Sequence, residues 1–275
     1  MSAGNGTPTY EAVDPVHSLA AIADRLIREA TVASLATIER NGGHPYASLV
    51  EVATLPDSRP VMLLSALARH SRNLEADSRV ALLVDKREHP GASLATARAT
   101  VMGTARQDPD PASLRRFLNR HPGADAYAGL GDFSLWRIDP TAVHVVAGFG
   151  RIGEIAWPLC GDATPGQSCV LTADDEAEII RRLGALLPAK IRELGLTERI
   201  PEVRFAGADR AGIDLLIASG ERREAIRMTY ASRAHGVEDA VAMACDLIYR
   251  WIHSISGTSA DRQRKKAKPN ARSGG

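Results

Sequence analysis

Residues 31–55 read TVASLATIE, RNGGH and PYASLVEVATL in succession, and this stretch decides the fold. Two runs rich in β-branched and alternating apolar residues flank Asn41-Gly42, a dipeptide typical of tight turns between antiparallel strands. The stretch therefore predicts a β-hairpin. Apolar residues at helical spacing over about 18–30 precede it and predict a first helix, which Ser18 can cap.

Further strands follow at short intervals. Four more segments rich in apolar residues are bounded by turn residues and predict strands. They are PVMLLSA (60–66), RVALLVD (79–85), RATVMGTAR (98–106) and the stretch from DFSLWRI to TAVHVVAGFG (132–150). A short helix is expected near 111–124. Six strands with hairpin connections and two marginal helices predict a closed antiparallel barrel rather than a parallel sheet.

The second half of the chain has a different pattern. An apolar stripe at helical spacing near 172–194 is followed by three short β-rich runs and a last helix near 237–253. The predicted fold class is α+β, with a six-stranded antiparallel split β-barrel and a small C-terminal α-β-β-β-α domain. The expected parts are an irregular leader (1–16), the barrel domain (17–157), a linker (158–170), the α+β domain (171–255) and a basic disordered tail (256–275).

Charge and cysteine content narrow the function classes. The last 17 residues hold six basic residues and one acidic residue, so a formal net charge of +1 for the chain leaves −4 for the rest. That balance argues against a nucleic-acid-binding body, although the tail alone could contact RNA, DNA or anionic lipid.

Three widely spaced cysteines show no metal-ligand spacing, and no signal-peptide or bilayer-spanning pattern is present. We therefore expect a cytoplasmic protein with no metal site and no membrane partner.

The segment 65–74, SALARHSRNL, joins two predicted strands and is the strongest candidate for ligand chemistry. It contains two arginines, a histidine, two serines and an asparagine. A phosphate monoester requires such surroundings, namely fixed positive charge and several short hydrogen-bond donors. A solvated connection that binds nothing is the alternative interpretation of the same residues.

The order of helix, hairpin, strand, Arg-His loop and strand resembles the pyridoxamine-phosphate-oxidase-like FMN-binding split barrel. Arg69-His70 matches the basic pair of that family, and residues 77–79 match a later Asp-Pro-Arg step in which Ser78 replaces proline. Ser48 lies where pyridoxamine phosphate oxidase has a phosphate-binding arginine, which argues against that particular reaction. The resemblance implies FMN at a homodimer interface, held by Ser48, Ser65, Arg69, His70, Ser71 and Asn73.

The resemblance extends to the HugZ-type haem-utilisation branch, which joins this barrel to a C-terminal α-β-β-β-α domain. Many members carry a histidine cluster on the first helix of that domain, but this chain has Asp174-Asp175-Glu176 and no histidine there. If haem is bound, the candidate axial ligands are His144, on an apolar strand, and His253, at the end of the last helix. A structural role is the alternative for both histidines.

Three functions remain open at this stage. The first is an FMN-dependent oxidoreductase acting on a small molecule, with substrate and catalytic residues unassigned. The second is a haem-binding or haem-degrading protein on the same scaffold. The third is a non-catalytic binding protein that has lost its cofactor and uses the C-terminal domain or the tail to bind a partner.

Overall fold

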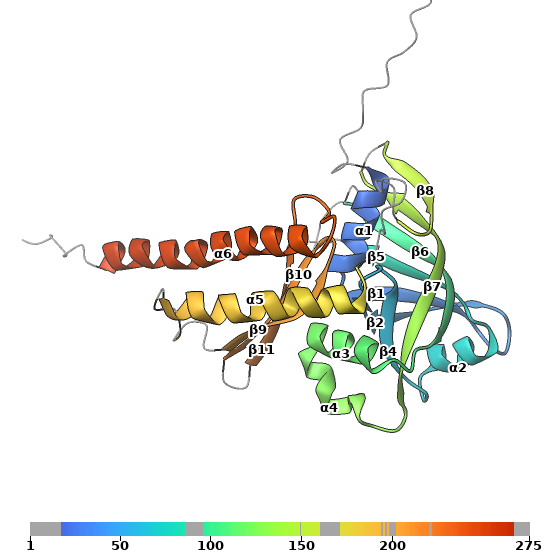
Figure 1. The fold of residues 1–275 in the computed structure, drawn as a ribbon. Coiled ribbons are helices and arrows are strands. Elements are labelled where there is room, and N and C mark those ends of the chain that lie inside the picture. The colour runs from blue at the N-terminus through green and yellow to red at the C-terminus, as the bar shows by residue number, and fades with distance from the viewer. Residues whose placement is uncertain are drawn as a thin grey trace, which may run out of the picture.

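The computed structural model describes residues 18–85, 96–148, 150–159, 171–193, 195, 197, 202–219 and 222–266. Figure 1 shows two parts, a curled antiparallel sheet with short helices around it and a three-stranded sheet covered by two long helices. The predicted α+β class and split barrel are confirmed.

The barrel sheet has eight strands in the order β2-β1-β5-β6-β7-β4-β3, and β8 pairs with β7 outside this path. All of its pairings are antiparallel, as hairpin connections require. The strands are β1 (Val32–Ile38), β2 (Pro45–Glu51), β3 (Ala53–Thr54), β4 (Pro60–Ser65), β5 (Arg79–Asp85), β6 (Arg98–Gln107), β7 (Phe133–Val146) and β8 (Ile152–Ala156).

Val52 is the point at which the chain passes from one end of the sheet to the other. It separates β2, the strand at one end, from β3, the strand at the opposite end. Its backbone N–H donates to the carbonyl of Thr31 at 3.0 Å. This crossing curls the sheet into a half-barrel.

One face of the barrel sheet forms the core. Leu35, Leu82, Val101 and Val143 lie in one row across β1, β5, β6 and β7, and all four are fully buried. Helix α1 (Leu19–Glu29) closes this face and starts at Ser18, whose hydroxyl accepts a hydrogen bond from the helix as expected. Burial of aliphatic side chains is therefore what holds the barrel together.

The other face is covered only in part by the described residues. Helix α3 (Pro111–Arg120), the 3₁₀ turn η2 (Pro122–Ala124) and helix α4 (Asp125–Ala128) cover it at β3 and β4, where Phe117 is fully buried. From β2 to β8 its side chains are half-buried or exposed, including Leu49 at 74% exposure. We call this second region the outer face.

The C-terminal unit has the predicted α-β-β-β-α order. Its strands β9 (Glu202–Asp209), β10 (Gly212–Ser219) and β11 (Arg222–Thr229) form an antiparallel sheet in the order β11-β10-β9. Helices α5 (Ala173–Glu193) and α6 (Val237–Lys266) pack together against one face of this sheet. Figure 1 shows both helices projecting away from the barrel.

Several expected boundaries are wrong. An unpredicted strand, β8, follows β7 and pairs with it. The polar run after Ser65 forms a full helix, α2 (Arg69–Ala76). Helix α6 continues to Lys266, past its expected end at 253 and into the stretch expected to be disordered. The leader, most of the linker and the chain beyond 266 lie outside the described residues.

Candidate functional site

The segment that leaves β4 turns into α2 through a tight set of hydrogen bonds. The Ser65 hydroxyl donates to Asp132 at 2.6 Å and accepts from the Leu67 N–H at 3.1 Å. The buried Ser71 hydroxyl donates to the Ser65 carbonyl at 2.7 Å. Both serines are therefore engaged in fixing the turn, although the sequence pattern marked them as phosphate ligands.

Asn73 is also occupied by the fold. Its side chain is 2% exposed, its amide donates to the Thr37 hydroxyl at 2.9 Å, and its carbonyl oxygen accepts from the Arg40 N–H at 3.2 Å. These bonds tie α2 to β1 and to the turn of the hairpin. A buried amide with satisfied partners has little capacity left for a ligand.

The other three predicted residues meet at the start of α2. The His70 Nδ1 lies 3.2 Å from the Ser48 hydroxyl oxygen on β2, and burial lowers the pKa of His70. The Arg69 guanidinium is paired with Glu39 and lies over the Tyr46 ring, 5.1 Å from its centroid. Arg69 is itself exposed, so this end of the helix presents a positive charge to solvent.

The start of α2 has a further property that suits an anion. Its N-cap residue is Ala68, which makes no side-chain capping bond to the first turn. The first N–H groups of a helix need acceptors, and an anion is stabilised there by these donors and by the helix dipole. Ser48, Arg69 and His70 thus lie together at the first turn of α2, in surroundings whose chemistry suits an anion.

His144 lies elsewhere, on the outer face. Direct cross-strand pairs place Leu49, Ser34, Leu83, Thr100, His144 and Glu154 in one row from β2 to β8. Because side chains alternate along a strand, Ser48 points to the face opposite its neighbour Leu49. The structure therefore does not bring His144 together with the residues at the start of α2.

The row next to His144 is made of small and apolar side chains. It runs through Ala47, Ala36, Ala81, Met102, Ala142 and Ala156, again by direct cross-strand pairing. The apolar residues most exposed on this face are Leu49, Ile152, Val32 and Leu83. Exposed apolar residues gathered on one face are typical of surfaces that contact another protein or an apolar ligand.

His253 lies on the far half of α6. It is exposed, and its ring packs edge-on against Tyr249 with centroids 4.2 Å apart. Among the described residues no group of three or more His, Cys, Asp or Glu side chains is arranged to hold a metal ion. No helix in the same part of the chain is both long and apolar enough to cross a bilayer.

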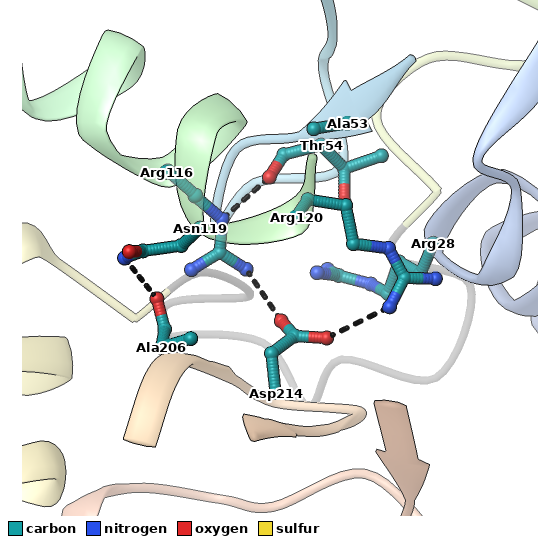
Figure 2. Close-up of a pocket in the computed structure, with 8 residues that line it drawn as sticks. All are labelled: Arg28, Ala53, Thr54, Arg116, Asn119, Arg120, Ala206 and Asp214. Atoms are coloured by element: carbon teal, nitrogen blue, oxygen red, sulfur yellow. Dashed lines mark hydrogen bonds and ion pairs between the residues drawn. The ribbon is translucent and has the colours of Figure 1, made fainter. Parts of the chain in front are cut away.

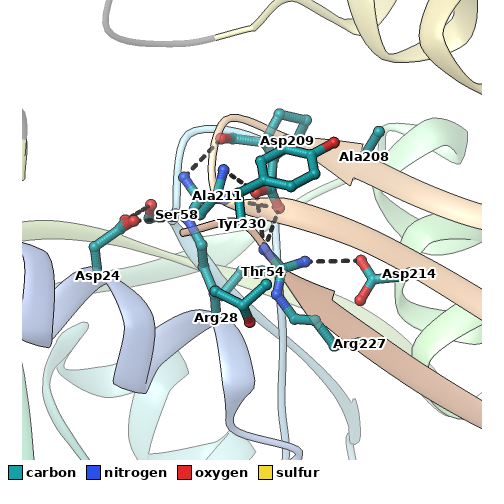
Figure 3. A network of polar contacts seen from close by, with 12 residues as sticks. Asp24, Arg28, Thr54, Ser58, Ala208, Asp209, Ala211, Asp214, Arg227 and Tyr230 are labelled. Carbon is teal, nitrogen blue, oxygen red and sulfur yellow. Dashed lines mark hydrogen bonds and ion pairs between the residues drawn. The ribbon is translucent and has the colours of Figure 1, made fainter. Parts of the chain in front are cut away.

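The boundary between barrel and C-terminal unit carries a buried polar region that no local sequence pattern predicted. A cavity of about 10 Å³ lies there, with Arg28, Arg116, Arg120 and Asp214 in its lining (Figure 2). Asp209 lies beside it, is fully buried and accepts from Arg116 at 3.0 Å. It also accepts from Arg227 at 2.8 Å (Figure 3). These ionic contacts join the two parts of the molecule.

Comparison with known proteins now identifies the scaffold. The family model for pyridoxamine 5'-phosphate oxidase matches residues 20–147, which span α1 and the barrel strands through β7. This part of the chain, its barrel, is a split barrel of the pyridoxamine 5'-phosphate oxidase-like superfamily. The resemblance read from the hairpin and the Arg69-His70 loop is confirmed.

Two relatives within this superfamily are haem proteins by name. A solved structure described as a heme binding protein from Mycobacterium smegmatis is 28% identical, with a TM-score of 0.51, and the match covers 87% of this chain and 98% of the other. The non-canonical heme oxygenase HOZ, chloroplastic, from Arabidopsis thaliana is 34% identical over 109 residues, 38% of this chain. This chain spans only a third (33%) of that relative's length.

A third solved structure extends the likeness in fold alone. The protein Atu2129 from Agrobacterium tumefaciens, of unknown function, is 23% identical with a TM-score of 0.58, over 86% of this chain and 99% of its own. The two long structural matches include most of the C-terminal unit as well as the barrel. The likeness to both solved structures is therefore not confined to the barrel.

Proposed function

We propose that this protein binds haem on the outer face of its barrel, between two copies of the chain, with His144 as the axial ligand. The observation that carries the proposal is the match to the Mycobacterium smegmatis heme binding protein, which extends over both parts of the molecule. The family model, by contrast, covers the barrel alone. Haem was the alternative to FMN in the sequence interpretation.

The surroundings of His144 suit a flat apolar ring. The imidazole is half-buried, and the neighbouring row of alanines with Met102 leaves little side-chain bulk above the sheet. A neutral imidazole nitrogen is a common haem ligand, and its second nitrogen needs an acceptor to hold the ring in place. Glu154 is the cross-strand partner of His144 and supplies a carboxylate on the same face.

Haem, when bound, supplies an iron centre that coordinates histidine and reacts with oxygen. The contribution of the chain is to bind and orient this group and to exclude water from it. One sheet face covers only one side of a macrocycle. A second copy, related by two-fold symmetry and packed through the same exposed apolar residues, would cover the other side. The proposal therefore includes a homodimer.

Hemin titration of the purified protein tests this function. The wild type is expected to develop a Soret band that saturates at one haem per site, and His144→Ala to shift or lose that band. His253→Ala is the matched control, because it removes a histidine from the far half of α6 and should leave the band unchanged. A wild type without a Soret band, or an unaltered spectrum in His144→Ala, would overturn the proposal.

FMN is the second candidate, and the start of α2 favours it. Arg69, His70 and Ser48 surround an uncapped helix start, which fits the phosphate of a flavin nucleotide. Ser65, Ser71 and Asn73 do not fit that role, since their polar groups are bonded within the fold. In this case the flavin would supply the electron chemistry of an oxidoreductase, and the residues around α2 would hold its phosphate.

Titration with FMN, followed by quenching of flavin fluorescence, tests the second candidate. Arg69→Gln is expected to weaken binding about tenfold or more, because it removes the exposed charge at the start of the helix. Arg72→Gln, which neutralises an exposed arginine one turn further along α2, is the matched control and should bind as the wild type does. No quenching with the wild type would exclude this candidate.

A further inference from the structure

The two rows that flank His144 on the outer face differ in character. On one side lies the row of alanines with Met102. On the other side, a row of direct cross-strand pairs runs from β5 to β8 through Asp85, Arg98, Val146 and Ile152. Among the described residues of these two rows and of the His144 row, Arg98 is the one arginine or lysine. His144 therefore has apolar neighbours on one side and a cation on the other.

Arg98 lies at the start of β6, close to His144 and on the same face. The direct partner of His144 on β6 is Thr100, so Arg98 occupies the diagonal position two residues away. Such diagonal positions lie about 7–8 Å apart between Cα atoms, within reach of a long side chain. Ala99 is 1% exposed and packs in the barrel core, so alternation along the strand places Arg98 on the outer face. A half-buried arginine therefore lies beside the half-buried histidine.

Asp85 is the direct cross-strand neighbour of Arg98 and competes for its guanidinium. Asp85 is exposed, and opposite charges that face each other across strands at a surface contribute little, because solvent screens them. A guanidinium has five N–H donors in a planar fork, more than one carboxylate accepts. Arg98 can therefore bind a second carboxylate at this edge of the outer face while Asp85 stays beside it.

The ligand proposed for this face has the same division of character. Haem is an apolar ring that carries carboxylates along one edge. An ionised carboxylate laid on apolar side chains without a partner is costly, so that edge must meet charge or water. The alanine row offers no charge, whereas Arg98 offers one on the opposite side of His144. The two rows therefore favour one orientation of the ring.

We propose that Arg98 binds a carboxylate of the ligand, and that it thereby selects carboxylate-bearing porphyrins and fixes their orientation on the outer face. The inference rests on the proposed haem function and adds to it the class of ligand. That class is porphyrins with free carboxylates along one edge, as opposed to their esters. His144 recognises the metal and Arg98 recognises the charged edge, so the two residues read different parts of the ligand.

Titration of the full chain with hemin and with hemin dimethyl ester under identical conditions separates these two contributions. The ester keeps the iron and the ring but lacks the ionised carboxylates. The wild type is expected to bind hemin at least about tenfold more tightly, since a charge-assisted hydrogen bond to arginine is open to hemin alone. Arg98→Gln should bind hemin about tenfold more weakly than the wild type and bind the ester equally well. The ester titration therefore also shows that the variant is folded.

Asp85→Asn tests the same contact from the other direction. It removes the carboxylate that competes for Arg98, so the variant is expected to bind hemin several-fold more tightly than the wild type, with no change for the ester. A gain of affinity of this kind does not arise from a misfolded protein.

Arg79→Gln is the matched control. Arg79 also lies on the outer face, where it pairs with Asp77. It is four residues along β5 from Leu83, the member of the His144 row on that strand, which is about 13 Å. This variant should keep the wild-type preference for hemin over the ester.

The outcomes separate the role of Arg98 from the haem site as a whole. A wild type that binds hemin and its ester equally, or an Arg98→Gln variant that keeps the preference, overturns the role of Arg98 and leaves the haem site standing. An unchanged hemin affinity in Asp85→Asn counts against that role as well. A wild type that develops a Soret band with neither ligand overturns the proposed function itself, and the role of Arg98 with it.

Discussion

Arg28 of the barrel and Asp209 of the C-terminal unit form a buried ion pair, with 2.9 Å between Nη1 and Oδ2. Asp209 is fully buried and also accepts from Arg227, which Figure 3 shows, and from Arg116. One carboxylate therefore holds three guanidinium groups, from α1, α3 and β11. Opposite charges at such distances are strongly coupled inside a protein. This residue therefore decides how firmly the two parts of the molecule are joined.

Asp209→Asn is expected to destabilise the protein by about 3–5 kcal/mol, since it leaves three buried guanidinium groups without their shared partner. Urea unfolding measures the change. Asp77→Asn is the control, because Asp77 pairs with Arg79 on the surface, where solvent screens the pair and its contribution to stability is small. Equal losses in the two variants would show that the network does not couple the two units.

The same carboxylate predicts how stability depends on pH. The three arginines outweigh the effect of burial and hold the pKa of Asp209 below its usual range. A carboxyl with a lowered folded pKa contributes stability that is present above the unfolded pKa of about 4 and is lost as pH falls toward the folded pKa. The wild type should lose this contribution below about pH 4. Asp209→Asn, measured in parallel, should show a flatter profile there.

The barrel strands and the ionic network between the two units differ in how far the sequence could predict them. Alternating apolar residues and the Asn41-Gly42 turn are local signals, and they predicted the hairpin, the barrel strands and the α2 loop. The ionic network joins residues about 180 positions apart, such as Arg28 and Asp209, and no local pattern marks such a pair. The burial of Ser71 and Asn73 was not predicted for a related reason, because a polar side chain in a loop sequence carries no sign of its burial.

Strand β7 shows a second limit of local signals. Proline cannot donate to a sheet ladder, so the step Asp139-Pro140 is unfavourable inside a strand. In the structure the strand continues, because Pro140 pairs with Gly103 of β6 beside a register shift between Met102 and Gly103. Such a bulge tolerates the missing N–H group. The compensating residue lies 37 positions earlier in the chain, beyond the reach of a turn signal.

This arrangement predicts that Gly103→Ala is strongly destabilising. A Cβ atom at Gly103 would lie 2.3 Å from the carbonyl oxygen of Asp139 and 2.8 Å from the Cα of Pro140, and both are backbone atoms. Overpacking against backbone forces the strands apart and costs about 3 kcal/mol. Gly123→Ala, where no atom lies within 4 Å of the added Cβ, is the control in the same urea experiment. Similar midpoints for both variants would contradict the pairing.

The outer face predicts the oligomeric state. Leu49→Glu places a charge at the most exposed apolar position of that face and is expected to convert a dimer to a monomer, as measured by light scattering after size exclusion. Leu186→Glu alters a comparably exposed leucine on α5 and should leave the mass unchanged. A wild type that is monomeric at micromolar concentration would refute the dimer, and with it the shared haem site.

His70 offers a test of the environment at the start of α2. Because burial lowers its pKa, the unfolded chain takes up a proton before the folded protein does, and stability falls as pH drops below about 6.5. Compared with His70→Gln, the wild type is expected to lose stability between pH 7 and pH 5, and the loss is small because the side chain is only half-buried. Urea unfolding at each pH measures the difference. Ser48→Ala should still lose stability as the pH falls, because burial rather than the Ser48 hydroxyl lowers the pKa of His70. Parallel profiles of stability against pH for His70→Gln and the wild type would contradict the buried position of this histidine.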